Sequence, residues 1–284
     1  MYVPYLNQIR TRRKVIGELM ALGAVASLAA IAPRPAAAQP GVTTPDGRYY
    51  DAYVPAATKE GQYYQYSCEF DASWAVLATF GFDVTFEEQL AIVGHDTSIE
   101  PYYESTADGF VVYGGDITSA YSGDYTSNLL ARTTGKAMLP LFQHYGLEAI
   151  PVDTREGIVD TLNGGGLIWM KATVDFLGWE PVTWITPQGA SLPGVLGNDH
   201  ALVVMGYNDY GVVIRDVLGP TSSNWERVYE YDVAWETFLP VFAAQGNDGI
   251  GVFPPGAAVA PKEAPAAAPA SDIIQPSAPK QICC

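Results

Sequence analysis

Residues 62–80 read Gln62-Tyr-Tyr-Gln-Tyr-Ser-Cys68-Glu-Phe-Asp-Ala-Ser-Trp-Ala-Val-Leu-Ala-Thr-Phe80. Apolar residues recur here at helical spacing, which predicts a buried helix over residues 69–80, and Gly81 is typical of the residue that ends a helix. The other two cysteines, Cys283 and Cys284, are the last residues of the chain, so Cys68 has no nearby disulfide partner. We therefore expect Cys68 to be either a small core residue or a nucleophile.

A thiol is a useful nucleophile at neutral pH when a helix N-terminus or a nearby imidazolium stabilises its thiolate. Cys68 has the first of these, and a histidine brought near by the fold would supply the second. Of the three histidines, His95 follows a predicted helix end and His144 lies on an apolar helix, so both are better explained as structural residues. His200 begins a predicted strand, and we favour it as the partner of Cys68.

A carboxylate that orients the imidazole of His200 is the third expected group. Asp216 lies on the next predicted strand, and the pairing of these two strands brings it near His200. Asp199 is the alternative, but adjacent residues of a strand point to opposite faces of the sheet. We therefore favour Asp216.

A side-chain amide beside the backbone N–H of Cys68 is the expected donor to the oxyanion of a tetrahedral intermediate. Gln62 lies six residues before the cysteine and Gln65 lies three residues before it. We favour Gln62, although a glutamine before a cysteine is weak evidence by itself.

The first half of the chain predicts mainly helices and the second half predicts mainly strands. Thr85-Phe-Glu-Glu88 is a capping box for a helix that ends near Val93. Residues 96–125 are expected to form a long surface loop. Further helices are expected over residues 127–133, 136–145, 155–162 and 234–243, and strands over residues 147–152, 167–174, 200–207, 211–217, 225–231 and 249–253. This is an α+β layout, with the helix of Cys68 packed across an antiparallel sheet.

The two ends of the chain differ in composition from residues 45–254, which we expect to form one domain. In residues 1–38, basic residues precede an apolar run and an Ala-x-Ala ending, which predicts an export signal cleaved after Ala38. Its Arg12-Arg13 pair resembles a twin-arginine signal. We therefore expect an extracellular, periplasmic or cell-surface protein. Residues 255–284 are rich in Ala and Pro and predict a disordered tail, and nothing explains its terminal Cys283-Cys284 pair.

The formal charge of the chain is −16, and it becomes −20 without residues 1–38, which hold five basic residues and one acidic residue. Such a surface repels nucleic acids and anionic lipids. No stretch after residue 38 approaches the roughly 20 apolar residues that span a bilayer. His, Cys and carboxylate residues do not occur at metal-ligand spacing, so we expect neither a metal nor an organic cofactor.

Residues 62–69 resemble the nucleophile segment of the bacteriocin-leader, or double-glycine, cysteine peptidases of the papain clan. In that family a glutamine lies six residues before the cysteine, and Cys-Glu often replaces Cys-Gly in the stand-alone secreted branch. Two more segments are similar to the histidine and aspartate strands of the family: Asn198-Asp-His200-Ala-Leu-Val-Val-Met-Gly-Tyr207 and Val212-Val-Ile-Arg-Asp216. The resemblance covers roughly residues 50–254.

The resemblance implies a papain-like α+β fold and a secreted cysteine peptidase that acts on a peptide or protein. It implies that Cys68 attacks the peptide carbonyl and that His200, oriented by Asp216, transfers protons. Gln62 would hold the oxyanion. Two alternatives stay open: an amidase or acyl transferase with the same residues, and a catalytically silent peptide- or wall-binding module. The oligomeric state is not predicted.

Overall fold

The computed structural model describes residues 39–107, 109–221 and 224–257, all of them within the unit Pro35–Cys284. The predicted export signal and the tail from residue 258, with Cys283 and Cys284, lie outside the described residues. In the described part of the chain, no helix has the length and hydropathy that crossing a bilayer requires.

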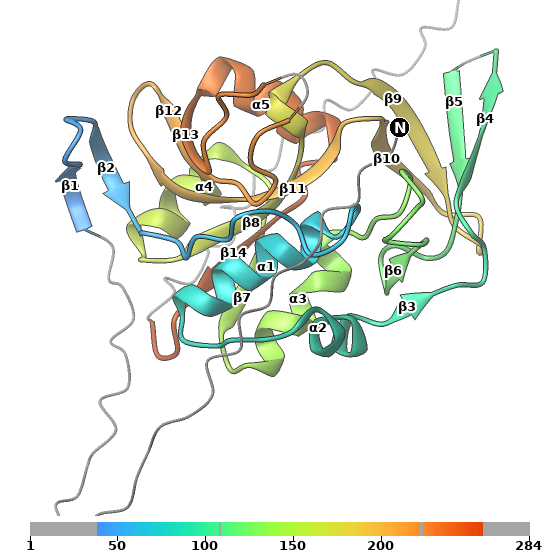
Figure 1. Cartoon of the computed structure of the whole chain (residues 1–284), viewed down its shortest axis with the longest axis horizontal. Helices are drawn as coiled ribbons and strands as arrows, with labels where there is room; N and C mark the ends of the chain where they lie inside the picture. Colours follow the sequence, from blue (N-terminus) through green and yellow to red (C-terminus); the bar gives the residue numbers. More distant parts are fainter. Residues whose placement is uncertain (1–38, 108, 222–223, 258–284) are drawn as a thin grey trace, which may run out of the picture. The chain divides into compact units, whose positions relative to one another are not determined.

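An eight-stranded antiparallel sheet is the largest sheet of the described residues (Figure 1). Its strands follow the order β1-β2-β11-β8-β14-β7, and β12 and β13 extend it from β11. The strand bounds are β1 Gln39–Thr43, β2 Tyr49–Tyr53, β7 Glu148–Val152, β8 Leu167–Thr173, β11 Asp199–Tyr207, β12 Gly211–Arg215, β13 Glu230–Ala234 and β14 Gly249–Phe253.

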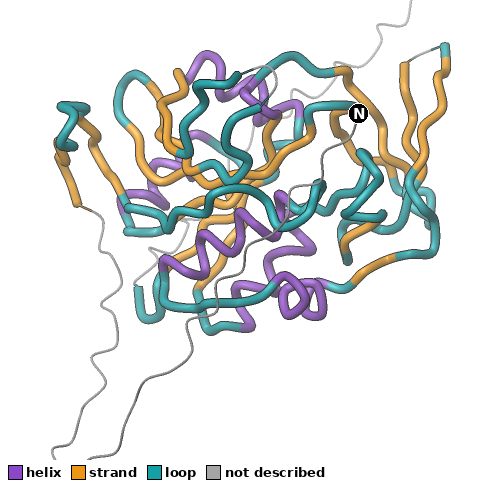
Figure 2. The backbone as a smooth tube through the Cα atoms, viewed as in Figure 1, coloured by secondary structure: helices purple, strands orange, loops and turns teal. Residues whose placement is uncertain are grey.

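Helices cover both faces of this sheet, as the tube in Figure 2 shows. Helices α1 (Cys68–Thr79), α2 (Phe86–Val93) and α3 (Gly135–His144) share a core with one face. Helices α4 (Arg155–Asn163) and α5 (Trp235–Ala244) share a core with the other. Alternate residues of β11 enter the two cores: Val203 packs on the α1 side, and Leu202 packs on the α5 side. This follows from the two-residue period of a strand.

The predicted α+β arrangement, with the helix of Cys68 across an antiparallel sheet, is confirmed: α1 packs on β11 and β8. The capping box is also confirmed. The Thr85 side chain accepts from the backbone N–H of Glu88, while the Glu88 carboxylate accepts from the backbone N–H of Thr85. Helix α3 continues through Pro140, which lies inside it.

The prediction of a long loop over residues 96–125 is wrong, because residues 102–106 and 109–113 of this segment pair into strands. A four-stranded sheet has the order β10-β9-β5-β4, and its β5–β9 pair is parallel and joins Phe110 to Val182, 72 residues apart in number. A periodicity search cannot find such a long-range pair. The bounds are β4 Tyr102–Thr106, β5 Gly109–Tyr113, β9 Glu180–Ile185 and β10 Ser191–Leu196. A short parallel pair joins β3 (His95–Asp96) to β6 (Tyr121–Ser122).

Two further predictions are wrong. Residues 127–133 form turns rather than a helix, because Asp124 binds the side chains of Thr126 and Ser127 and its carbonyl accepts from Asn128. Such Asp-centred turns compete with helix formation. The strand expected over residues 225–231 lies instead at β13, Glu230–Ala234. A short 3-10 helix, η1 (Val174–Phe176), follows β8.

Candidate active site

Cys68 is the first residue of α1 and is only 6% exposed. The loop before it is tied to the helix through Asp71, whose carboxylate accepts from the backbone N–H of Tyr63 at 3.1 Å and from the Ser67 hydroxyl at 2.6 Å. The first N–H groups of a helix have no partner within the helix, so the N–H of Cys68 is of the kind that binds an anion.

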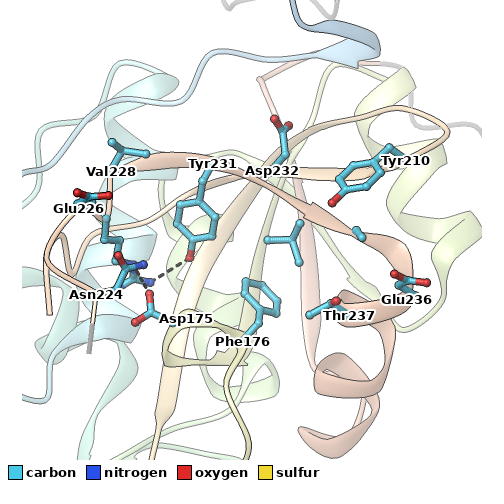
Figure 3. A pocket seen from close by; sticks show the side chains of 13 residues that line it. Asp175, Phe176, Tyr210, Asn224, Glu226, Val228, Tyr231, Asp232, Glu236 and Thr237 are labelled. Atoms are coloured by element: carbon cyan, nitrogen blue, oxygen red, sulfur yellow. Dashed lines mark hydrogen bonds and ion pairs between the residues drawn. The ribbon is translucent and has the colours of Figure 1, made fainter. Parts of the chain in front are cut away.

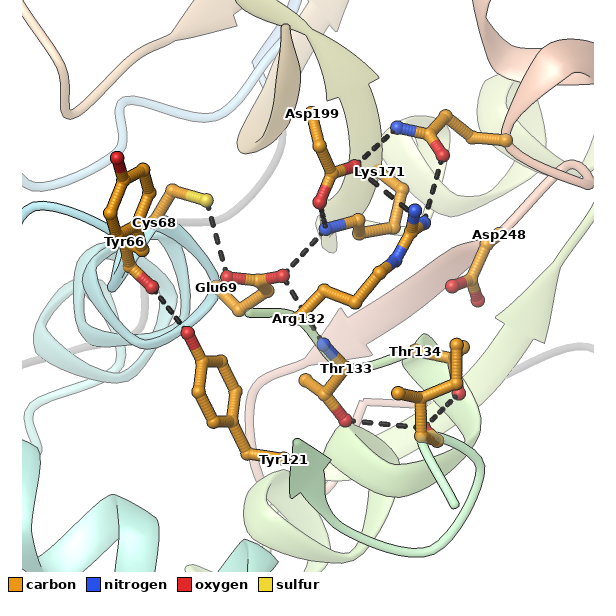
Figure 4. Close-up of polar contacts among 12 residues, drawn as sticks. Tyr66, Cys68, Glu69, Tyr121, Arg132, Thr133, Thr134, Lys171, Asp199 and Asp248 are labelled. Carbon is orange, nitrogen blue, oxygen red and sulfur yellow. Dashed lines mark hydrogen bonds and ion pairs between the residues drawn. The ribbon is translucent and has the colours of Figure 1, made fainter. Parts of the chain in front are cut away.

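The Cys68 thiol belongs to a chain of buried polar contacts (Figure 4). Its Sγ donates to Glu69 Oε2 at 3.2 Å. The other oxygen of Glu69 accepts from Lys171 Nζ at 2.6 Å and from the backbone N–H of Thr133 at 3.3 Å. Both Glu69 and Lys171 are fully buried. A charged pair is retained in such surroundings only when each partner is hydrogen-bonded, as here.

Asp199, on β11, extends this chain. Its Oδ2 accepts from Lys171 Nζ at 2.8 Å, and its Oδ1 accepts from Gln245 Nε2 at 2.6 Å. Arg132 lies 3.6 Å from Asp199 and donates to the Gln245 amide oxygen at 3.0 Å. Two carboxylates and two cations therefore alternate, which balances the buried charge. We call Glu69, Lys171, Asp199, Arg132 and Gln245 the buried ion network.

Burial raises the pKa of the Cys68 thiol well above its usual value, and the negative charge of Glu69 raises it further. Lys171 acts in the opposite direction without overcoming these two effects. The position of Cys68 at a helix N-terminus therefore does not by itself produce a thiolate. In the resting protein the sulfur is a thiol that donates to Glu69.

His200 and Asp216 form a second polar group. His200 Nε2 lies 2.9 Å from Asp216 Oδ1, and both side chains are buried. A carboxylate only accepts, so Nε2 carries a proton, and Nδ1 is the nitrogen left to exchange a proton with another group. Asp216 also accepts from the backbone N–H of Leu218 at 2.9 Å, from the Tyr231 hydroxyl at 2.7 Å and from Arg227.

These partners decide the charge of Asp216. Burial alone would raise its pKa, but the attraction of His200 and its hydrogen bond, together with Arg227, lower the pKa below the usual range. Arg227 is itself held by Asp175, whose Oδ1 lies 2.8 Å from its Nε. Asp216 therefore stays ionised and fixes the orientation of the His200 ring.

The lowered pKa of Asp216 predicts how acid destabilises the protein. A carboxylate with a lower pKa in the folded chain adds stability that is present above its unfolded pKa, about 3.9, and is lost as the pH falls through the folded value. Urea unfolding at several pH values between 2 and 7 gives the free energy of unfolding as a function of pH. As the pH falls, this free energy should decrease less steeply in Asp216→Asn than in the wild type. Coinciding slopes in the two proteins would contradict the assignment.

The structure brings some of the predicted site residues together and not others. His200 pairs with Asp216, and Asp199 binds Lys171 and Gln245 instead. Among the contacts of the described residues, none joins Cys68 to His200. Asp199 and His200 are neighbours at the start of β11, and their side chains point to opposite faces of the sheet.

The remaining predicted residues have the following positions. Gln62 is partly buried in the loop before α1 and makes no hydrogen bond to another described residue, whereas Gln65 is exposed and donates to the Tyr66 hydroxyl at 3.0 Å. His95 Nε2 contacts the backbone oxygen of Gly123 at 2.9 Å, and His144 is exposed on α3. The catalytic roles of Cys68, His200, Asp216 and Gln62 stay predictions.

A pocket of about 460 Å³ lies beside the residues that hold Asp216 (Figure 3). Arg227 and Tyr231 line it, and so does Asp175, but Cys68 and His200 do not. Four carboxylates face it: Asp175, Glu226, Asp232 and Glu236.

The sequence reasoning missed the buried ion network. One signal was available: Lys171 follows the apolar residues 167–170 on β8. A charge on a buried strand requires a partner of opposite charge. Glu69 lies next to Cys68 on a helix of mostly buried residues, so it requires a positively charged partner for the same reason. Arg132 and Gln245 gave no such signal, because only the fold brings them to Asp199.

The described residues contain no group of three or more His, Cys, Asp or Glu side chains that could hold a metal ion. No protein-family model matches the chain, and no curated protein matches its sequence. The chain is similar in structure to a candidate C39-like peptidase from Bacillus anthracis, with a TM-score of 0.53 and 15% sequence identity. The match covers 70% of this chain and 94% of that one. The fold is therefore similar to that of a C39-like peptidase, and the match shows the fold alone.

Proposed function

We propose that this protein is an exported cysteine peptidase that hydrolyses peptide bonds with Cys68 as its nucleophile. The observation that carries the proposal is the buried His200–Asp216 pair, held on a C39-like fold whose α1 begins at Cys68. Export rests on the sequence of residues 1–38, and it places the peptide substrate outside the cytoplasm.

In the proposed reaction the Cys68 side chain turns from Glu69 toward His200, and the thiol proton passes to His200 Nδ1 as the sulfur bonds to the peptide carbonyl carbon. The backbone N–H of Cys68 and the Gln62 amide donate to the oxyanion. His200 then protonates the leaving amine as the C–N bond breaks, and it later takes a proton from the water that releases the acyl group.

Asp216 supports each of these steps by keeping Nε2 protonated and by stabilising the imidazolium that forms. The raised pKa of Cys68 favours proton transfer during the attack over a thiolate–imidazolium pair formed in advance. This differs from the activated thiolate that the sequence predicts.

A peptide-library experiment tests the proposal. The full-length protein is incubated with a defined mixture of peptides, and new termini are identified by mass spectrometry, with the Cys68→Ala variant as the blank. New N-termini in the wild type that are absent from the variant are the expected result. Identical product lists for both proteins would rule out peptide hydrolysis by Cys68.

Added amines detect the thioester, and the products formed without them separate hydrolysis from acyl transfer. Hydroxylamine and glycine amide are added to parallel reactions, because both compete with water for a thioester. Free carboxylates as the main product without added amine support a peptidase. Products joined to a second peptide in the absence of added amine would instead identify a transferase.

A further inference from the structure

We propose that Glu69 is a positioning residue for the nucleophile: anchored by Lys171 and Thr133, it holds the thiol of Cys68 in a resting hydrogen bond that must be released before the sulfur reacts. This inference rests on the proposed role of Cys68. It concerns a residue next to the nucleophile that neither bonds to the substrate nor transfers a proton in the proposed hydrolysis.

The geometry gives Glu69 two separate tasks. Its Oε1 is fixed by Lys171 Nζ at 2.6 Å and by the N–H of Thr133 at 3.3 Å, which leaves Oε2 to accept from Cys68 Sγ at 3.2 Å. The backbone is fixed as well, since Trp169 Nε1 donates to the Glu69 carbonyl at 3.0 Å. Glu69 is therefore held from one strand, β8, and from the loop that contains Thr133, and its Oε2 accepts from the sulfur (Figure 4).

The charged and titratable groups that influence Cys68 come from four elements. Glu69 lies on α1, Lys171 on β8 and Asp199 on β11, and the phenol of Tyr121 comes from β6. Both carboxylates disfavour a thiolate, and Lys171 favours one. Of these groups, Glu69 is the one hydrogen-bonded to the sulfur, so neutralising it should have the largest effect.

The Glu69→Gln variant removes one negative charge and keeps the shape of the side chain. Its amide oxygen can still accept from Lys171 and Thr133, and its NH₂ group can donate to a thiolate. The rate of reaction with iodoacetamide follows the thiolate fraction. We expect the midpoint of the pH–rate profile of Cys68 to fall by at least about one pH unit, which is about tenfold faster alkylation at pH 7.

The measurement follows the peptide that contains Cys68 by mass spectrometry, so that Cys283 and Cys284 do not contribute. The midpoint reports the thiolate, whereas the plateau at high pH reports access of the reagent. Asp71→Asn is the matched control, because Asp71 is a buried carboxylate of the same helix with no contact to the sulfur. It should leave the midpoint where it is in the wild type.

An unchanged midpoint in Glu69→Gln would overturn the inference, and so would an equal shift in Asp71→Asn. If Glu69→Gln does not fold, the wild type decides alone. Its midpoint should lie above that of glutathione measured in parallel, and a midpoint at or below that of glutathione would overturn the inference. None of these measurements depends on peptide cleavage, so failure of the proposed function and failure of this inference are seen separately.

Discussion

The Lys171→Met variant is expected to lower the free energy of unfolding by about 3–5 kcal/mol, because it leaves buried carboxylates without their cation. Glu69 would keep only the N–H of Thr133 and the thiol, and Asp199 would keep Arg132 and Gln245. Urea or guanidinium unfolding of the full-length protein at pH 7 measures the loss. In a domain of this size, each kcal/mol lowers the melting temperature by about 2–4 °C.

Lys59→Met is the matched control for this prediction. Lys59 also pairs with a buried carboxylate, Asp71, but at 3.4 Å and with a side chain that is 22% exposed. A pair of this kind contributes at most about 1 kcal/mol. The double variant Glu69→Gln/Lys171→Met should recover part of the loss, since it removes both charges. A Lys171→Met protein as stable as the control would contradict the view that the buried ion network is tightly coupled.

The Asp216→Asn variant is expected to lower kcat/KM for a cleaved peptide by about 10⁴-fold if the proposed mechanism holds. An amide in place of the carboxylate can donate to Nε2, which moves the imidazole proton to Nδ1. The nitrogen that should accept the thiol proton is then already occupied. Steady-state kinetics on a peptide from the library experiment, followed from pH 5 to pH 9, measures the loss.

Asp232→Asn provides the comparison for Asp216→Asn. Asp232 lies on β13 next to Tyr231, is exposed, and contacts Tyr50 and Arg48 rather than His200. The kcat/KM of the Asp232→Asn variant should stay within a few fold of the wild-type value. Equal losses in the two variants would point to a general effect of altering this end of the sheet. Wild-type kinetics in the Asp216→Asn variant would show that Asp216 has no role in the mechanism.

Local sequence patterns predicted most of the helices and the strands of the large sheet. The capping box at Thr85 placed the start of α2, and the apolar spacing after Cys68 placed α1 within one residue. These signals succeed because caps and amphipathic spacing act over three or four residues. The strands β4, β5, β9 and β10 were missed, and the pair that joins them into one sheet, β5 with β9, links residues far apart in sequence.

In the candidate site, too, some contacts could be predicted from local sequence and others could not. The pairing of His200 with Asp216 instead of Asp199 could be predicted from the alternation of side chains along a strand, which is a local property of the sequence. Glu69 and Lys171 are 102 residues apart, and Asp199 and Gln245 are 46 residues apart. Contacts over such separations form only when the sheet is assembled.

The sequence by itself determined that Cys68 begins a helix, that His200 begins a strand, and that the following strand brings Asp216 to it, because each depends on a local period or turn. Only the tertiary structure decided what surrounds the sulfur. By burying Glu69, Lys171 and Asp199 beside Cys68, the fold changed the expected thiolate into a hydrogen-bonded thiol. The physical reason is that pKa values depend on burial and on charges within a few ångströms, whatever their distance along the chain.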